Sequence, residues 1–549
     1  MNFLRSFLAG ACLLLCAVQP ALAGLHEDLQ RVEAERLERD PAWLALLHYR
    51  PDGSGIESQA DQPRFFLADG ARHSPRAELL AAVAALHDAA AAQDFACRFP
   101  ARFEWLSARL GREGAEALTS QCAALAEWLA AFPGRRVSID FASSYLENPS
   151  STFGHTFLRI YRESSDELLS PTINYAARTD AREGDLAFVT KGLFGGFPGV
   201  ADTLPFYRRL RTYTEIEGRD IHEYELSLTP AEVRRLLLHT WEIKDGVFDY
   251  YFIHENCAYR TLALLDAARP GTGLLDRFGA VTVPVDTVRA LRAAGMLGAQ
   301  RLWPSLPKRV RDLETQVDGE DGALARQLAL GLATPAQVRT LSPARQAGTL
   351  QLAYEYGAVL IDRDEGDRVR RKEIPGAITK ARLALAQPEV LASRSTPNGP
   401  EDGHDGGLLA ASLRQRGGRH APALDYAAFQ HSLTDPLPGY EPHAEITVLN
   451  PEIEIGADRV RLRRIDWLVA QSTIPSSTLF APRAWRVELT TRATPFAGRD
   501  HMATRLAYHT GRAWLLPGIP CWRCCPAWGL KPAAACRTTP PCSVRCAPR

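Results

Sequence analysis

One cysteine, Cys257, has the residue type and the local context that suggest chemistry in this 549-residue chain. It follows Asn256, a residue type that favours the N-cap of a helix, and the apolar run after it predicts a helix over 257–267. A thiol in the first turn of a helix lies near the positive end of the helix dipole, which lowers its pKa and favours the nucleophilic thiolate. A buried cysteine that serves packing alone is the alternative.

A thiolate nucleophile needs a histidine as its base, and His155 is the best-placed candidate. A polar loop precedes it, and it begins a predicted strand, so that a rigid sheet could aim its ring. The alternatives are His222, His239 and His254. His239 lies within a predicted helix and reads as structural, and one histidine three residues before Cys257 does not make a zinc site. We therefore expect no metal and no cofactor.

The elements that must position these residues follow from the periodicity of the sequence. Alternating apolar and polar residues predict strands at 135–142, 155–161, 172–176 and 221–228. Thr229, Pro230 and Glu232 form a capping box that begins a helix after the fourth strand. This mixture of strands and helices predicts an α+β unit over 131–300, which carries both candidate residues.

Other domains flank this unit. Residues 24–130 have helical spacing and predict a small helical domain, and 301–375 predict a helical connector. Short alternating strands punctuated by Gly and Pro predict an antiparallel β domain over 376–510.

The placement of the cysteines indicates an oxidising compartment. A short basic start, an apolar run and Ala21-Leu22-Ala23 read as a secretory signal peptide over 1–23, cleaved after Ala23. Between this segment and the C-terminal tail only Cys97, Cys122 and Cys257 occur. Because an exported protein favours disulfides, we expect a Cys97–Cys122 bridge, which leaves Cys257 as a thiol.

Several segments resemble the Lnb N-terminal periplasmic domain family. They are SYLENPSSTFGHTFLRIY (144–161), TINYAA (172–177), GLFGGFPG (192–199) and YYFIHENCAYRTLALLD (250–266). The resemblance implies a circularly permuted papain-like, NlpC-type fold in which the catalytic His precedes the catalytic Cys. It implies that His155 and Cys257 are these residues. Members of the family named Lnb are lipoprotein N-acyltransferases.

This resemblance implies a periplasmic thiol acyltransferase. A Cys257 thiolate would take an acyl chain from a phospholipid as a thioester and pass it to the N-terminal amine of a lipoprotein, and the protein would contact a membrane peripherally. Asn174 is the candidate that would orient the His155 ring, as Asn does in papain-like enzymes, although a strand-end Asn of no catalytic role is the alternative. Tyr145 and Ser151 could line the site, and turn chemistry explains them as well. The alternative functions are an envelope amidase or peptidase of the same fold, and a non-catalytic envelope scaffold.

The glycine-rich segment 192–199 carries Phe194 and Phe197 between the two catalytic motifs. We expect it to form a lid whose rings touch acyl chains or the bilayer surface. The alternative is a turn that buries both rings in the core.

The overall charge is an average over two unlike parts of the chain. Lys plus Arg and Asp plus Glu are both 64, a balance that argues against nucleic-acid binding. Residues 511–549 hold six basic residues, six cysteines and no acidic residue, so the rest of the chain has 58 basic against 64 acidic residues. We interpret this tail as aberrant, with a slipped reading frame as the hypothesis.

Overall fold

A computed structural model describes residues 24–515 of the chain, except for 52, 54, 147–151, 163–165, 179–189, 193–194, 247, 280, 364–367, 387–390, 392–398, 417–418, 457–458 and 497–498. The expected signal peptide, Ser151, Phe194 and almost all of the C-terminal tail lie outside the described residues. The chain divides into two compact units. The first comprises 1–140, 156–207 and 224–299, and the second comprises 141–155, 208–223 and 300–549.

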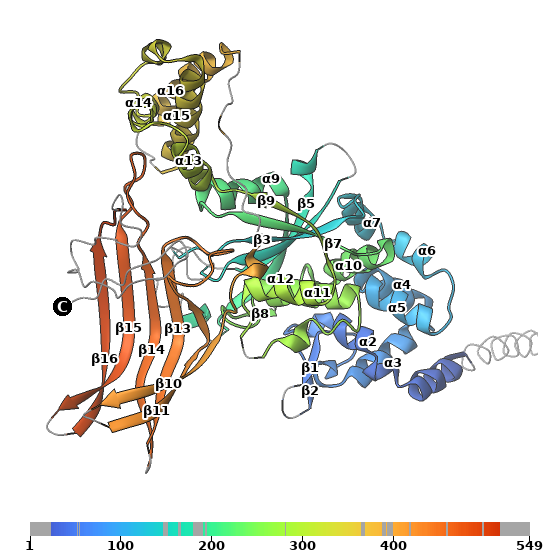
Figure 1. Ribbon diagram of the computed structural model, residues 1–549. Coiled ribbons are helices and arrows are strands. Elements are labelled where there is room, and N and C mark those ends of the chain that lie inside the picture. The colour runs from blue at the N-terminus through green and yellow to red at the C-terminus, as the bar shows by residue number, and fades with distance from the viewer. Residues whose placement is uncertain are drawn as a thin grey trace, which may run out of the picture. The chain divides into compact units, whose positions relative to one another are not determined.

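The first unit begins with short helices (Figure 1). They are α2 (Pro41–Leu46), α3 (Pro75–Ala85), α4 (Ala89–Arg98), α5 (Pro100–Arg109), α6 (Ala115–Ser120) and α7 (Ala123–Ala130), with a small hairpin of β1 (Tyr49–Pro51) and β2 (Ile56–Ser58). Side chains cap several of them, as where Ser74 accepts a hydrogen bond from the backbone N–H of Ala77 at the start of α3. A disulfide joins Cys97 to Cys122 with 5.4 Å between their Cα atoms.

A seven-stranded sheet follows, in the order β8-β6-β5-β4-β3-β7-β9. Its strands are β3 (Val137–Ala142), β4 (His155–Ile160), β5 (Pro171–Ala177), β6 (Phe197–Pro205), β7 (Ile221–Leu226), β8 (Phe248–Tyr250) and β9 (Leu297–Trp303). The four expected strands are present, whereas β6, β8 and β9 were not expected. Gly, Pro and Asp in β6 disfavour a strand, and its pairing with β5 over the whole of 171–177 overrides that preference.

Three helices accompany this sheet: α10 (Pro230–Ile243), α11 (Cys257–Ala268) and α12 (Pro284–Ala293). The capping box of Thr229 and Glu232 begins α10 as the sequence predicts. Helix α11 packs against β5, α10 and α12, and every one of its residues is buried. The first turn of α11 is therefore held by the surrounding core.

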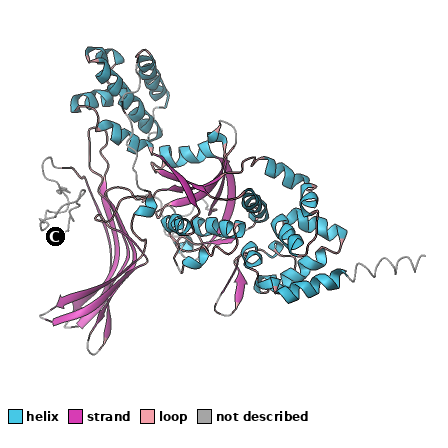
Figure 2. Ribbon diagram, turned by 45° about the vertical axis from the view of Figure 1, so that its right-hand side comes forward, coloured by secondary structure: helices cyan, strands magenta, loops and turns pink. Residues whose placement is uncertain are grey.

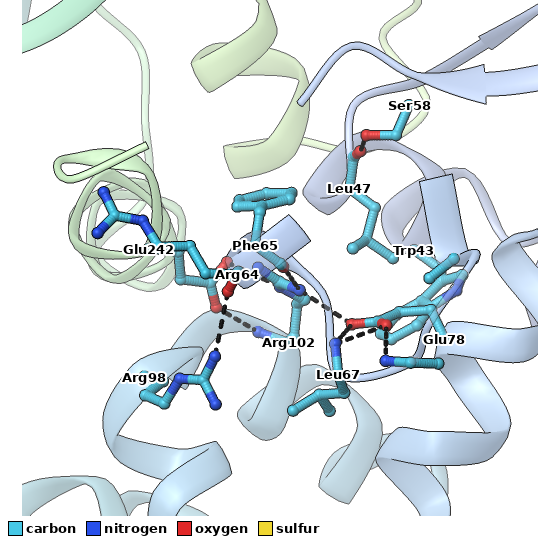
Figure 3. A network of polar contacts seen from close by, with 12 residues as sticks. Trp43, Leu47, Ser58, Arg64, Phe65, Leu67, Glu78, Arg98, Arg102 and Glu242 are labelled. Atoms are coloured by element: carbon cyan, nitrogen blue, oxygen red, sulfur yellow. Dashed lines mark hydrogen bonds and ion pairs between the residues drawn. The ribbon is translucent and has the colours of Figure 1, made fainter. Parts of the chain in front are cut away.

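A buried charge network ties the N-terminal helices to α10 within the first unit (Figure 3). Arg102 of α5 is fully buried and contacts Glu78 at 3.2 Å and Glu242 at 3.4 Å. Its Nη1 also donates to the carbonyl oxygen of Phe65. Glu242 in turn accepts from the ring of His239 at 3.0 Å, which makes His239 a structural residue, as expected. Burial raises the pKa of Glu78.

The second unit contains a helical part and an antiparallel sheet. Its longer helices are α13 (Leu306–Glu314), α14 (Gly319–Ala329), α15 (Pro343–Arg363) and α16 (Arg368–Leu383), which share one hydrophobic core. The sheet has the order β10-β11-β13-β14-β15-β16, with β12 paired to β13. Its strands are β10 (Leu408–Arg416), β11 (Arg419–Ala427), β12 (Phe429–His431), β13 (Ala444–Ile455), β14 (Val460–Ser472), β15 (Ala484–Phe496) and β16 (Arg499–Gly511). These long neighbouring strands stand out in magenta in Figure 2.

Mixed helices and antiparallel sheets agree with the α+β class expected from the sequence. Among the described residues no helix is both long enough and apolar enough to span a membrane.

Candidate functional site

The thiol of Cys257 lies at the first position of α11 and is 2% exposed. Asn256 is the N-cap, and its Oδ1 accepts hydrogen bonds from the backbone N–H groups of Ala258 at 3.1 Å and Tyr259 at 3.2 Å. Its Nδ2 donates to the carbonyl oxygens of Phe252 and Thr282. The side chain of Asn256 therefore fixes the start of the helix and connects it to the chain on either side.

Tyr250 is the neighbour of the thiol that sequence reasoning missed. Its buried hydroxyl interacts with the thiol and with the backbone N–H of Cys257. Burial raises the pKa of Tyr250 well above its usual value, and the adjacent thiol raises it further. The phenol thus keeps its proton at neutral pH and remains a hydrogen-bond donor. The sequence feature that could have identified Tyr250 as a site residue is its place in the motif YYFIHENC, seven residues before the cysteine.

The glycine-rich segment provides space for the aromatic residues that lead to Cys257. A Cβ on Gly192 would lie 2.2 Å from the ring of Phe252, and one on Gly195 would lie 2.4 Å from that of Tyr251. The backbone N–H of Phe252 also donates to the carbonyl oxygen of Gly192 at 2.7 Å. The glycines therefore allow the segment before the thiol to pack closely.

The expectation of an exposed lid is wrong for Phe197. Its side chain is 2% exposed, begins β6, and stacks on Phe252 with 6.2 Å between the ring centroids. Burial of this large apolar ring in the core stabilises the fold more than its exposure to water on a loop would. Phe194 lies outside the described residues.

Asn174 is buried in β5, in the first unit. Its Nδ2 donates to Oδ2 of Asp202 at 3.2 Å, across the pairing of β5 with β6. The amide of Asn174 thus has a carboxylate partner that the sequence did not indicate. Its expected role in orienting a catalytic ring stays a prediction.

His155 lies at the start of β4 in the second unit, 7% exposed. Its ring packs on Tyr213, with 5.8 Å between centroids. Tyr213 belongs to a rare π-helical segment, η6 (Arg211–Ile216), a geometry that often marks functional sites. The guanidinium of Arg219 lies over the ring of Tyr213, 5.0 Å from its centroid, and donates to the carbonyl oxygens of Ala142 and Ser143.

The second unit also contains a cavity of about 870 Å³, a volume typical of small-molecule sites. Ser143, Tyr145 and His222 line it, and so do the cationic side chains of Lys308 and Arg483. Burial lowers the pKa of His222 to about 4, with Lys308 lowering it further, so the ring is neutral at pH 7. The expected substrate contact Tyr145 therefore lies on a cavity wall, whereas Ser151 lies outside the described residues.

The other candidate base, His254, is partly exposed and contacts Glu255 at 3.4 Å and the ring of Tyr251. Burial lowers its pKa, as does Arg260. It remains an alternative to His155 on chemical grounds.

Comparison with known families bears on the segment that holds both His155 and Cys257. Residues 124–294 match the Lnb N-terminal periplasmic domain family. This is the family that the four motifs resemble, and it indicates a periplasmic protein of the cell envelope.

Two further family models match segments on either side of residues 124–294. Residues 35–109 match a domain of unknown function, DUF7843, and residues 397–522 match another, DUF7840. No curated protein and no solved structure matches the chain.

Proposed function

We propose that this protein is an exported cysteine acyltransferase that moves an acyl chain from a phospholipid to the N-terminal amine of a lipoprotein. The observation that carries the proposal is the setting of Cys257. Among the described cysteines it alone is outside the disulfide, and it begins a buried helix beside a protonated phenol. A structural cysteine needs neither feature. We infer further that the sheet and α11 form a circularly permuted papain-like core, because α11 packs on β5 and His155 precedes Cys257.

The first step forms a thioester. The Cys257 thiolate attacks the ester carbonyl carbon of the phospholipid, and the carbonyl oxygen becomes an oxyanion. When the ester C–O bond breaks, the leaving alkoxide of the lysophospholipid takes a proton from the His155 imidazolium. Phospholipid use requires peripheral contact of the protein with a membrane.

The second step releases the acyl chain to the acceptor. The N-terminal amine of the lipoprotein attacks the thioester carbonyl, and neutral His155 takes a proton from that amine. Collapse of the tetrahedral intermediate breaks the C–S bond and restores the thiolate. No cofactor takes part in this sequence.

Tyr250 is the residue that we assign to the oxyanion. Its phenol stays protonated and lies by the backbone N–H of Cys257, which is the amide that papain-like geometry uses for the same purpose. Loss of one such donor typically slows the chemical step by about 10²–10³-fold. Tyr250→Phe, which preserves the ring and its packing, should therefore lower the rate of acyl transfer while leaving the folded state intact.

The decisive experiment is the isolation of an acyl adduct. The purified chain is incubated with phospholipid and without acceptor, and the peptide that carries Cys257 is analysed by mass spectrometry. We expect one acyl group on Cys257, none in Cys257→Ala, and strongly reduced labelling in His155→Gln. His420→Gln, at an exposed position in β11, is the matched histidine control and should label normally.

Addition of a diacylglyceryl lipopeptide then separates transfer from hydrolysis. Transfer predicts that the acyl group appears on the lipopeptide amine. Release as free fatty acid at the same rate with and without lipopeptide would favour a hydrolase. Full complementation of a deletion strain by Cys257→Ala would remove both enzymatic functions and leave the scaffold.

A further inference from the structure

Two histidines and an aspartate meet in the second unit, in residues that the acyltransferase proposal does not use. His404 precedes β10, His431 ends β12, and Asp435 lies in the loop that connects β12 to β13. One donor atom from each of the three lies within 4.8 Å of the others. We propose that they bind one Zn²⁺ ion, which holds the 432–443 loop against the sheet.

The ring of His404 is oriented as a metal ligand requires. Its Nδ1 lies 2.7 Å from the backbone carbonyl oxygen of Asp405. A carbonyl oxygen can only accept, so Nδ1 carries the proton and Nε2 presents its lone pair. Metal-binding histidines in proteins are usually fixed by a hydrogen bond of this kind to the other ring nitrogen.

That lone pair points at His431. Nε2 of His404 lies 2.8 Å from Nδ1 of His431, and the two ring planes differ by 10°. His431 is buried, with 1% of its surface exposed. Its Nε2 is buried without a hydrogen-bond partner among the described residues. A shift of the ring proton from Nδ1 to Nε2, which frees Nδ1 for a metal, therefore breaks no hydrogen bond at Nε2.

Asp435 supplies the negative charge. Its Oδ2 lies 4.0 Å from Nε2 of His404 and accepts a hydrogen bond from the backbone N–H of Ser432 at 2.7 Å. Zinc in a tetrahedral site holds nitrogen and oxygen ligands at about 2.0–2.2 Å, so adjacent ligand atoms lie roughly 3.3 Å apart. The two rings must separate by about 0.5 Å, and the partly exposed carboxylate must move closer to the ring nitrogens by roughly 0.7–1.5 Å. Two histidines and one carboxylate leave a fourth position for water.

The site would organise one wall of the cavity. The ring of Tyr440 is parallel to both imidazoles, with centroids 4.8 Å from His404 and 4.1 Å from His431. The same Tyr440 lines the cavity together with Gly439 and Glu441 of the loop. A zinc ion on the two rings would therefore fix the position of Tyr440 and of the loop beside it.

Cobalt and zinc binding by the full chain test this site. Because the C-terminal tail holds six cysteines, the reactive thiols are alkylated first, and a tag without histidine is used. We expect one tight equivalent of Co²⁺, with no sulfur-to-cobalt charge-transfer absorption, that Zn²⁺ displaces. His404→Ala, His431→Ala and Asp435→Asn should each weaken zinc binding by about 100-fold or more. His420→Ala, an exposed histidine of β11, should bind as the unmodified sequence does.

A second measurement keeps the test independent of folding defects. Zinc should slow hydrogen exchange in residues 432–443 of the unmodified sequence, and this protection should be lost in His404→Ala, whose ring is partly exposed. If the unmodified chain binds no more zinc than His404→Ala does, or if zinc leaves the exchange of 432–443 unchanged, the site does not exist. Neither result bears on acylation of Cys257.

Discussion

Replacement of Asn256 by alanine should loosen the start of α11 and expose the thiol. The substitution removes an N-cap, which costs about 1–2 kcal/mol. It also removes the donor to two buried backbone carbonyls, those of Phe252 and Thr282. A buried polar group left without a partner costs about 1–3 kcal/mol. With each carbonyl counted at the low end of that range, local opening of this segment should become easier by roughly 3–4 kcal/mol.

The alkylation rate of Cys257 measures this opening directly, because the thiol is 2% exposed in the folded state. Peptide mass spectrometry follows the rate at Cys257 and separates it from the cysteines of the tail. When closing is faster than alkylation, the rate tracks the opening free energy, and each 1.4 kcal/mol gives a factor of about ten. Asn256→Ala should therefore speed alkylation by roughly two to three orders of magnitude.

A second N-cap in the same unit provides the control. Thr229 caps α10 through a hydrogen bond from the backbone N–H of Glu232, at an exposed position. Thr229→Ala should cost about 1 kcal/mol and change alkylation of Cys257 by less than tenfold. Equal effects of the two substitutions would refute the reasoning, since Asn256 would then act as an ordinary cap.

Three further substitutions test the packing and electrostatics of the first unit. Arg102→Met should destabilise this unit by about 3–5 kcal/mol in urea denaturation, because two buried carboxylates lose their cation; a loss below 1 kcal/mol would show that water compensates them. Hydrogen bonds from Arg269 lower the pKa of Glu232 to about 2, so its stabilising contribution is present above pH 4.5 and is lost as the pH falls towards 2. After allowance for solvent screening, Glu232→Gln should lower the free energy of unfolding, measured by urea denaturation, by about 1 kcal/mol at pH 7 and by little at pH 2. A loss that does not change with pH would contradict this. Gly192→Ala should clash with the Phe252 ring and abolish acyl labelling, whereas Gly279→Ala, with nothing near its Cβ, should label normally.

Local sequence determined the start of α11 and the candidate nucleophile. An Asn N-cap acts through hydrogen bonds to amides two and three residues away, so residues 256–259 carry the whole signal. The same holds for the capping box of Thr229 and Glu232. The Cys97–Cys122 bridge could be predicted because only three cysteines lie between the expected signal peptide and the C-terminal tail. Strands with alternating residues were predicted for the same local reason.

Only the tertiary structure decided what surrounds these residues. The glycines of 192–199 predicted a mobile lid. In the structure the rings of Tyr251 and Phe252 pack closely on two of these glycines. Strand β6 exists because β5 supplies its hydrogen bonds, against the preferences of its own residues.

The proposed zinc ligands show the same limit, because His404 and His431 lie 27 residues apart in the sequence and meet only in the folded chain. The Tyr250 hydroxyl reaches Cys257 because the chain turns back between β8 and α11. Sequence periodicity reports which face of an element is buried, whereas the partner on that face depends on contacts between distant segments. The nucleophile was therefore readable from the sequence, and its surroundings were not.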